Sequence, residues 1–245
     1  MAIDDNRAPA ALLRDGDLAA AFDRAAAGYD RLVACNPGYH AHLRRSARRL
    51  GPRPGGAAPP RLLDLGCGTG ASTAALLAAH PGARVTAVDA SAGMLARATA
   101  KRWPPGVTFV HAPAERLADA GVTGPFDGVL AAYLFRNVAD PDRLLRDVRQ
   151  LLAPGGRLAV HEYTLSGRPS HRAVWAAVCG GLVRPVGALT GDRQLYRHLW
   201  HSVIAFDTAA QFTGRVRRAG FHAVRAAPMP GWQRGIVHTV VGTAA

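Results

Sequence analysis

Three glycines alternate with small residues in the stretch LLDLGCGTGAS, residues 62 to 72. Because glycine has no Cβ, the backbone of Gly66, Gly68 and Gly70 can approach a ligand closely and adopt positive φ. A helix that begins directly after such a turn points its free N–H groups into the turn. We therefore predict that residues 66 to 70 form the floor of a cofactor pocket, in which Cys67 is a small side chain without thiol chemistry.

Two features of the neighbouring sequence narrow the class of cofactor. The spacing G-x-G-x-G differs from the G-x-G-x-x-G of dinucleotide sites, and the Gly-Lys-Ser or Gly-Lys-Thr of a phosphate-binding loop is absent. The next apolar run ends in VTAVDAS, which places Asp89 19 residues after Gly70. A carboxylate there can accept both hydroxyl hydrogens of a ribose, and Asp64 can pair with an ammonium group. These residues predict a cofactor with a ribose, no phosphates and a charged amino-acid end.

The elements that must position these residues alternate along the chain. Short β-type runs lie at 61–66, 83–88, 107–111, 126–131 and 156–162, and helical runs lie at 71–80, 91–102 and 140–152. Such alternation predicts a parallel sheet with helices on both faces. Two further strand-like runs, at 221–227 and 235–241, close the chain. The expected fold class is α/β: a Rossmann-like seven-stranded, mostly parallel sheet with a closing antiparallel hairpin and helical N-terminal and lid segments.

The chain divides into five segments on composition. Residues 1–50 predict an N-terminal helical segment, and GPRPGGAAPP at 51–60 is a linker because Pro and Gly dominate it. Residues 61–165 form the cofactor-binding core. Residues 166–206 are a helical insertion expected to cover the acceptor, and residues 207–245 add the closing helix and hairpin of the same domain.

Composition limits the binding partners and the cell compartment that we expect for this protein. The net charge is +13, and residues 166–245 contribute 10 basic against 2 acidic side chains. This basic end suits an anionic substrate or a peripheral contact with an anionic membrane, and a solvated basic face remains the alternative. The three scattered cysteines fit a reduced cytoplasm, and no apolar stretch is long enough to span a membrane. We expect no nucleic-acid partner, because no basic groove with interleaved aromatic residues is evident; a homodimer is left open.

No metal site is expected either. His198, Trp200 and His201 cluster in the sequence, but their spacing is not that of metal ligands, and we interpret them as ordinary helix residues.

The motifs LLDLGCGTG, VDAS and PGGRLAVHEY resemble the class I methyltransferases that use S-adenosylmethionine, over residues from about 20 to 242. The stretch YLFRNVADPDRLLRDVRQLLAPGGRLAVHEY is similar to the signature of the C-methyltransferases of ubiquinone and menaquinone biosynthesis. In that family an Arg-Asn pair follows the fourth strand, here Arg136 and Asn137, and a Glu-aromatic pair ends the fifth, here Glu162 and Tyr163. FDRAAAGYDRL, LYRHLWHSV and GIVHTVVG also resemble the family.

The resemblance implies S-adenosylmethionine as the methyl donor, S-adenosylhomocysteine as product, and a small-molecule acceptor that can carry a prenyl tail. It assigns the donor to the glycine turn and its surroundings: Asp64, Gly66, Cys67, Gly68, Gly70, Asp89, Ala90, Met94, Ala114 and Tyr29. It assigns the acceptor to Arg136 and Asn137, and we add Trp175 from the apolar side chains of the insertion. The apolar side chains of the insertion could line a channel for the tail or form ordinary core.

Two departures from the family concern the substrate. HAPAERL has Pro113 where the family usually carries Asp or Asn, and YHAHLRR replaces a lysine-bearing segment. The family activity that we expect is methylation of a ring carbon of a demethylmenaquinone-like quinol. The alternative is a methyltransferase of secondary metabolism that acts on carbon, oxygen or nitrogen of an aromatic or polyketide-like acceptor.

Methylation of a ring carbon needs an electron-rich ring, and a fixed cation beside the ring hydroxyl favours the phenolate. We predict that Arg136 supplies this cation; the alternative is a salt bridge from Arg136 to Asp140 or Asp142. His161 could take the ring proton, or be a packed histidine at the sheet edge. Tyr133 is the third catalytic candidate and is expected to line the pocket.

Overall fold

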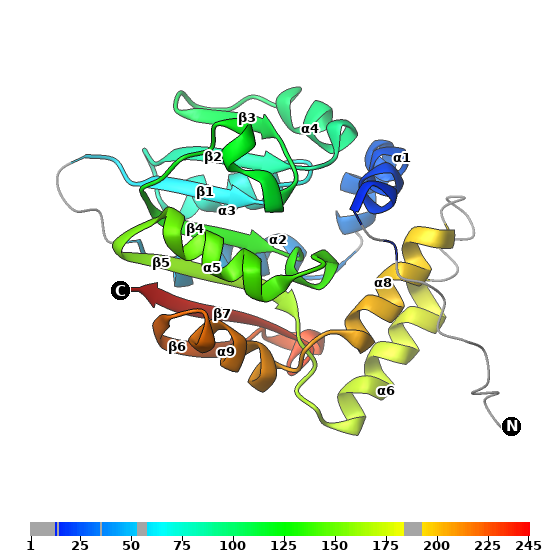
Figure 1. The fold of residues 1–245 in the computed structure, drawn as a ribbon. Coiled ribbons are helices and arrows are strands. Elements are labelled where there is room, and N and C mark those ends of the chain that lie inside the picture. Colours follow the sequence, from blue (N-terminus) through cyan, green and yellow to red (C-terminus); the bar gives the residue numbers. More distant parts are fainter. Residues whose placement is uncertain (1–12, 14, 35, 53–57, 184–192) are drawn as a thin grey trace, which may run out of the picture.

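A seven-stranded sheet forms the centre of the computed structural model, which describes residues 13, 15–34, 36–52, 58–183 and 193–245 (Figure 1). The strands lie in the order β3-β2-β1-β4-β5-β7-β6. They are β1 (Arg61–Leu65), β2 (Arg84–Asp89), β3 (Val107–His111), β4 (Phe126–Ala132), β5 (Leu152–Tyr163), β6 (Phe221–Pro228) and β7 (Val237–Ala244). Strands β1 to β5 pair in parallel, and β7 is antiparallel to both β5 and β6. The expected mostly parallel sheet with a closing antiparallel hairpin is confirmed.

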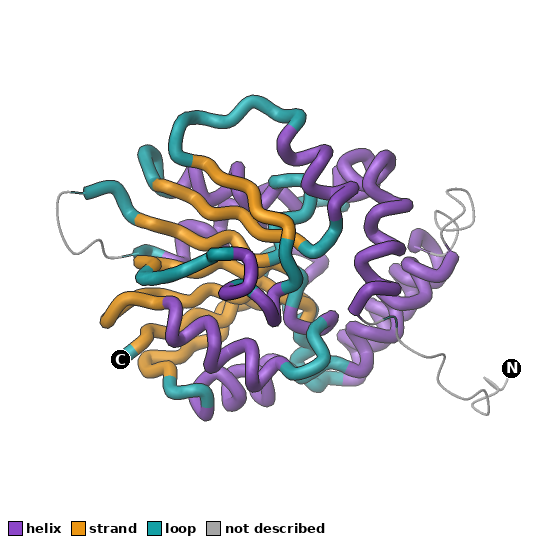
Figure 2. The backbone as a smooth tube through the Cα atoms, turned by 45° about the horizontal axis from the view of Figure 1, so that its top comes forward, coloured by secondary structure: helices purple, strands orange, loops and turns teal. Residues whose placement is uncertain are grey.

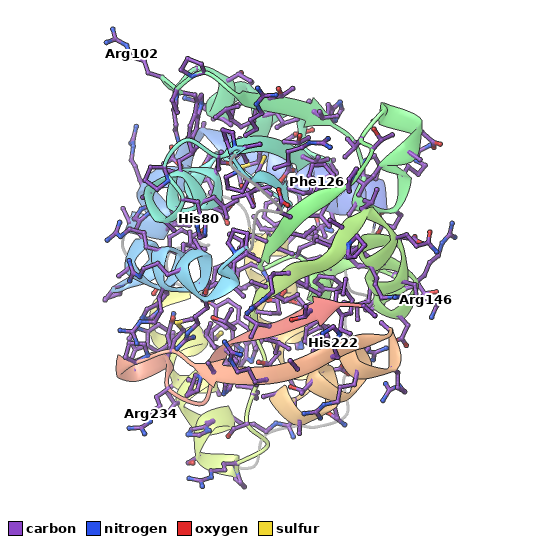
Figure 3. The ribbon with its side chains drawn as sticks, turned by 90° about the vertical axis from the view of Figure 1, so that its left-hand side faces the viewer. His80, Arg102, Phe126, Arg146, His222 and Arg234 are labelled. Atoms are coloured by element: carbon purple, nitrogen blue, oxygen red, sulfur yellow. The ribbon has the colours of Figure 1, made fainter. Side chains whose placement is uncertain are left out.

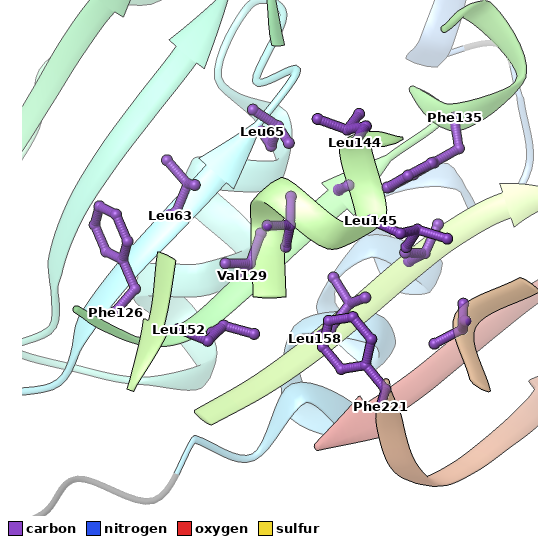
Figure 4. Close-up of a cluster of buried hydrophobic side chains, with 14 of the residues drawn as sticks. Leu63, Leu65, Phe126, Val129, Phe135, Leu144, Leu145, Leu152, Leu158 and Phe221 are labelled. Atoms are coloured by element: carbon purple, nitrogen blue, oxygen red, sulfur yellow. The ribbon is translucent and has the colours of Figure 1, made fainter. Parts of the chain in front are cut away.

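Helices cover both faces of the sheet. The helices α2 (Tyr39–Leu50) and α3 (Ala71–Ala79) pack on one face, and α5 (Pro141–Leu151) and α9 (Ala209–Arg218) pack on the other. Strand β1 shows the alternation: Leu62 joins the α2–α3 cluster, whereas Leu63 and Leu65 join the α5–α9 cluster (Figure 4). Because both faces of a parallel strand are covered, its sequence must be apolar almost throughout.

The start of α5 illustrates how local sequence sets an element boundary. The Asp140 side chain accepts a hydrogen bond of 2.9 Å from the Arg143 backbone N–H, which caps the helix. Pro141 occupies the first turn, where its missing N–H costs nothing. Leu144 and Val148 are then buried at helical spacing against the sheet.

Three helices gather beside the carboxyl ends of the parallel strands: α1 (Asp15–Ala34), α6 (Pro169–Val178) and α8 (Arg193–Ala205) (Figures 1 and 2). The helices α1 and α2 lie within the predicted N-terminal helical segment, and α6 and α8 lie within the predicted insertion. Residues 53–57 of the linker and 184–192 of the insertion lie outside the described residues. In open α/β sheets ligands bind at this edge, so the helices surround the expected site.

The view onto the opposite end of the sheet shows the long basic side chains of Arg102, Arg146 and Arg234 projecting outward (Figure 3). All three are exposed. Their charges therefore lie on solvated surface at the periphery of the fold.

Candidate active site

A cavity of about 740 Å³ opens at the carboxyl ends of β1, β2 and β4. This volume is in the range of small-molecule and cofactor sites. Most of the residues that the sequence assigned to a site line it: Tyr29, Gly66, Cys67, Gly68, Asp89, Ala90, Met94, Ala114, Tyr133, Arg136 and Asn137. Four others, Asp64, Gly70, His161 and Trp175, are not part of its lining.

The glycine turn between β1 and α3 is built as the sequence suggested. The φ angles of Gly66, Gly68 and Gly70 are 76°, 54° and 91°, a region that favours glycine. Gly70 does not face the cavity; a Cβ there would approach the Trp103 ring to 2.7 Å, so close packing fixes this position. Cys67 is buried, and burial raises the pKa of its thiol, which keeps it protonated and unreactive.

Asp89 ends β2 on the cavity wall. One carboxylate oxygen accepts 2.7 Å from the backbone N–H of Gly68, and the other accepts 2.9 Å from that of Ser91. Burial raises the pKa of Asp89, and these hydrogen bonds act in the opposite direction. Each carboxylate oxygen can accept a further hydrogen, so a diol lying beside the glycine turn would find two acceptors.

Asp64 lies beneath the turn and is fully buried. Its Oδ2 accepts hydrogen bonds from the hydroxyls of Ser72 at 2.8 Å and Thr73 at 2.6 Å on α3. Its Oδ1 has no hydrogen-bond partner among the described residues. Burial raises the pKa of Asp64 to about 7, because the charged form loses hydration. The ammonium contact expected of Asp64 stays a prediction.

Arg136 forms a buried ion pair with Glu162 at 2.8 Å, with 7% and 1% of the two side chains exposed. The same guanidinium nitrogen donates 2.7 Å to the Tyr133 carbonyl, and the group lies 5.8 and 5.5 Å from the ring centres of Tyr133 and Tyr163. The alternative pairing with Asp140 or Asp142 is wrong, because Asp140 caps α5 and Asp142 pairs with Arg215. Glu162 is therefore the counterion that holds the Arg136 charge at the cavity.

His161 is completely buried on β5 and does not line the cavity, whereas its hydrogen-bond partner Tyr133 does. Its Nε2 lies 2.9 Å from the Tyr133 hydroxyl, and its Nδ1 lies 2.9 Å from the Ser46 hydroxyl. Burial lowers the pKa of His161 to about 3, so the imidazole is neutral at physiological pH. The proposed removal of a ring proton by His161 would therefore have to pass through Tyr133.

Comparison with known proteins places this geometry in a family. A model described as "Methyltransferase domain" matches residues 63–158. The ubiquinone/menaquinone biosynthesis C-methyltransferase UbiE of Syntrophotalea carbinolica is 34% identical over 67% of this chain and 70% of its own length. The demethylmenaquinone methyltransferase of Clavibacter sepedonicus is 33% identical over 86% of this chain and 84% of its own. The chain belongs to the ubiquinone/menaquinone biosynthesis C-methyltransferase family. It is thus an enzyme and a methyltransferase, as its motifs suggested.

Solved structures agree with the fold of this methyltransferase. A SAM-dependent methyltransferase from Thermotoga maritima superposes with a TM-score of 0.63, covering 93% of this chain and 100% of the other at 18% identity. A methyltransferase of Haloferax volcanii, solved with the activator Trm112, gives a TM-score of 0.64 at 19% identity and covers 95% and 99% of the two chains. At such identities the likeness concerns the fold alone, and it confirms the Rossmann-like class.

Of the residues predicted to bind the acceptor of this methyltransferase, Asn137 lines the cavity and Trp175 does not. Asn137 lines the cavity and donates 3.1 Å to the Tyr133 carbonyl, while its Oδ1 lies 3.0 Å from Nε2 of His198 on α8. Trp175 is 1% exposed and packs 4.8 Å from the Tyr163 ring in a separate apolar cluster. The core alternative thus describes Trp175 better than a wall of the cavity does. His198, interpreted as an ordinary helix residue, in fact connects the insertion to the site.

Sequence reasoning also missed how α1 of the methyltransferase is fastened beside the cavity. Asp23 accepts from the Ser91 hydroxyl and, at 2.8 Å, from the Gly93 backbone N–H at the start of α4 (Ala92–Thr99). Two helical turns later in α1, Asp30 forms an ion pair of 2.8 Å with Lys101. The spacing of the two aspartates by seven residues on a predicted helix was the signal that could have revealed a common face.

Within the described part of the chain, no group of three or more His, Cys, Asp or Glu residues could hold a metal ion. A search of the same residues finds no helix with the length and apolar character needed to cross a membrane.

Proposed function

We propose that this methyltransferase transfers a methyl group from S-adenosylmethionine to a ring carbon of a demethylmenaquinone-like quinol, leaving S-adenosylhomocysteine and releasing the proton of that ring carbon. The observation that carries the proposal is the extent of the family match. Three of the relatives named demethylmenaquinone methyltransferase match 85–86% of this chain at 32–33% identity, and this match includes segments on both the proposed donor and acceptor sides.

The donor side of the cavity fits S-adenosylmethionine. Asp89 offers its carboxylate to a ribose diol, and the turn at Gly66 and Gly68 leaves room for an amino-acid chain. Asp64 Oδ1 is a buried acceptor without a partner in the described residues, which suits an ammonium group directly or through water. Pro113 lines the cavity where adenine would lie, so backbone rather than a carboxylate or amide side chain would hold its amino group. The bound sulfonium supplies an electrophilic methyl group.

On the acceptor side, Arg136 would hold the ring hydroxyl in its phenolate form. Its guanidinium cannot lose a proton in a protein, so it acts as a fixed charge and donor rather than as a base. Glu162 offsets part of that charge but also prevents the side chain from rotating away. Holding donor and acceptor in line can contribute about 7–11 kcal/mol of rate acceleration. Asn137, tied to α8 through His198, would fix the far side of the ring.

The test is product analysis with purified enzyme, S-adenosylmethionine and a short-chain demethylmenaquinol kept reduced. Mass spectrometry should detect a singly methylated quinone, and a methyl signal on the ring in NMR should place it on carbon. A panel of phenols and polyketide-like aromatics run in parallel tests the alternative acceptor. Methylation of a panel compound with none of the quinol would reject the quinol and favour secondary metabolism.

We further propose a cytoplasmic enzyme that meets its prenylated acceptor at a membrane surface. The exposed arginines Arg44, Arg45 and Arg48 on α2 support this, because together they form a basic face suited to anionic lipid. Flotation with vesicles of anionic phospholipid should carry the protein upward, and with neutral vesicles it should not. A homodimer stays a hypothesis, to be tested by light scattering.

A further inference from the structure

A chain of hydrogen bonds crosses the protein from α2 to the cavity. Arg49 donates 3.0 Å to the Thr239 hydroxyl on β7, which lies 2.8 Å from the Ser46 hydroxyl. Ser46 in turn lies 2.9 Å from His161 Nδ1, and His161 Nε2 lies 2.9 Å from the Tyr133 hydroxyl. Thr239, Ser46 and His161 are buried, with at most 1% of each residue exposed.

The chain has a direction because a guanidinium only donates. Arg49 is held in place by the carbonyls of Ala227 and Pro228 at the end of β6, at 2.9 and 3.0 Å. Thr239 accepts from Arg49, and among the described residues its hydroxyl has one further partner, Ser46. A buried hydroxyl hydrogen without an acceptor is costly, so the Thr239 proton must point to Ser46.

The same reasoning continues to the cavity. Since Ser46 accepts from Thr239, its own proton goes to His161 Nδ1. The neutral imidazole then carries its single proton on Nε2 and donates it to the Tyr133 oxygen. Burial keeps both groups neutral, because it lowers the pKa of His161 and raises that of Tyr133. The proton of Tyr133 is consequently left to point away from His161, and Tyr133 is a residue that lines the cavity.

Backbone geometry holds the tyrosine in this position. Tyr133 has a φ of 58°, which is rare for a residue other than glycine, and its N–H donates 2.7 Å to the His161 carbonyl. Such a strained backbone conformation tends to occur at functional sites. The ring also stacks on Tyr39, with ring centres 5.7 Å apart and planes at 12°.

We propose that Tyr133 donates a hydrogen bond to the anionic oxygen of the bound acceptor, and that Arg49, Thr239, Ser46 and His161 are positioning residues that fix the direction of this donation. That the acceptor is a quinol with an anionic oxygen is taken from the proposed function, and to this extent the proposal rests on it. It reverses the role expected of His161, which here gives a proton to Tyr133 rather than receiving one from the ring. A hydroxyl whose direction is fixed before the quinol binds does not have to reorient during the reaction. Preorganised sites stabilise oxyanions in this way.

The direction of the chain can be tested without substrate. In ¹⁵N NMR of the histidine-labelled enzyme, the His161 ring should show the proton on Nε2; its signals are those that vanish in His161→Gln. Ser46→Ala should abolish this single tautomer. Ser202→Ala is the matched control. Ser202 is a similarly buried serine on α8 that donates to the Leu199 carbonyl and takes no part in this series of hydrogen bonds. A wild-type His161 with its proton on Nδ1 would overturn the proposal.

Kinetics test the consequence for the acceptor. Tyr133→Phe should lower kcat for the quinol by about 100-fold, as removal of one oxyanion donor does in other enzymes. Thr239→Val, which keeps the shape but breaks the hydrogen-bond chain, should lower kcat by about 10-fold, and Thr239→Ser should restore it. Wild-type rates in Tyr133→Phe or Thr239→Val would refute the proposal. A wild-type enzyme that does not methylate the quinol would refute the proposed function instead. The NMR experiment needs no substrate and would still test the direction of the hydrogen bonds.

Discussion

The ion pair between Arg136 and Glu162 gives a prediction about stability that differs for its two partners. Glu162→Gln leaves a guanidinium with 7% of its side chain exposed and no counterion. Arginine cannot shed its proton, so the loss of the partner should cost about 3–5 kcal/mol of unfolding free energy at any pH between 5 and 8. Total stabilities are about 5–15 kcal/mol, so this loss is large enough to measure.

Arg136→Met should behave differently, because Glu162 can escape its charge by taking up a proton. Burial raises the pKa of Glu162 above its ordinary value of 4.5, and removal of the cation raises it further. The folded state then binds a proton that the unfolded state releases above pH 4.5. The unfolding free energy of the variant should therefore fall as pH rises above that value, by up to about 1.4 kcal/mol per pH unit.

Urea unfolding followed by circular dichroism at pH 5.5 and 8 measures both effects. The double variant Arg136→Met/Glu162→Gln should recover most of the loss, since it buries no lone charge. Arg215→Met is the control: Arg215 also forms ion pairs, here with two aspartates, but its side chain is 22% exposed, so its loss should cost only about 1 kcal/mol. A loss below about 1 kcal/mol in Glu162→Gln, or a pH-independent loss in Arg136→Met, would refute the reasoning.

Three further predictions concern the donor side. Gly70→Ala should lower stability by about 1–3 kcal/mol, seen as a reduced melting temperature, because its φ of 91° is strained for alanine and the new Cβ would meet Trp103 at 2.7 Å; an unchanged melting temperature would contradict it. Asp23→Ala removes the acceptor for Ser91 and for the first turn of α4, and should cost about 1 kcal/mol in urea unfolding; equal midpoints would speak against this fastening of α1. Burial raises the pKa of Asp64 to about 7, so below that pH the folded state holds a proton that the unfolded state loses above about pH 4. The wild type should lose stability relative to Asp64→Asn as pH rises from 4 to 7, and parallel pH profiles would contradict the raised pKa.

The geometry of the glycine turn and the place of Asp89 were predictable because their signals are local in sequence. Glycines with positive φ and an acid at the end of the next strand follow from the geometry of one βαβ unit. Strand alternation also explains Asp64, whose neighbours Leu63 and Leu65 face α5 and α9, so that Asp64 faces α3 and its hydroxyls.

The surroundings of Arg136 and Asn137 depend on contacts between distant segments, and the sequence carried no periodic signal for these contacts. The Arg136–Glu162 pair follows from the register of β4 and β5, which sets Ala132 opposite His161. That register could be anticipated only once the two strands were known to be neighbours. The contact between Asn137 and His198, 61 residues apart, depends on how the insertion docks, which composition and spacing do not determine.

The central claim is that the cavity holds S-adenosylmethionine against its glycine turn through Asp89. Isothermal calorimetry with S-adenosylhomocysteine tests it most directly. We predict saturable binding at one site per chain in the wild type, at least about 10-fold weaker binding in Asp89→Ala, and wild-type binding in Asp119→Ala, which removes an exposed aspartate outside the cavity. Folded wild-type protein that binds neither S-adenosylhomocysteine nor S-adenosylmethionine, or undiminished affinity in Asp89→Ala, would contradict the account.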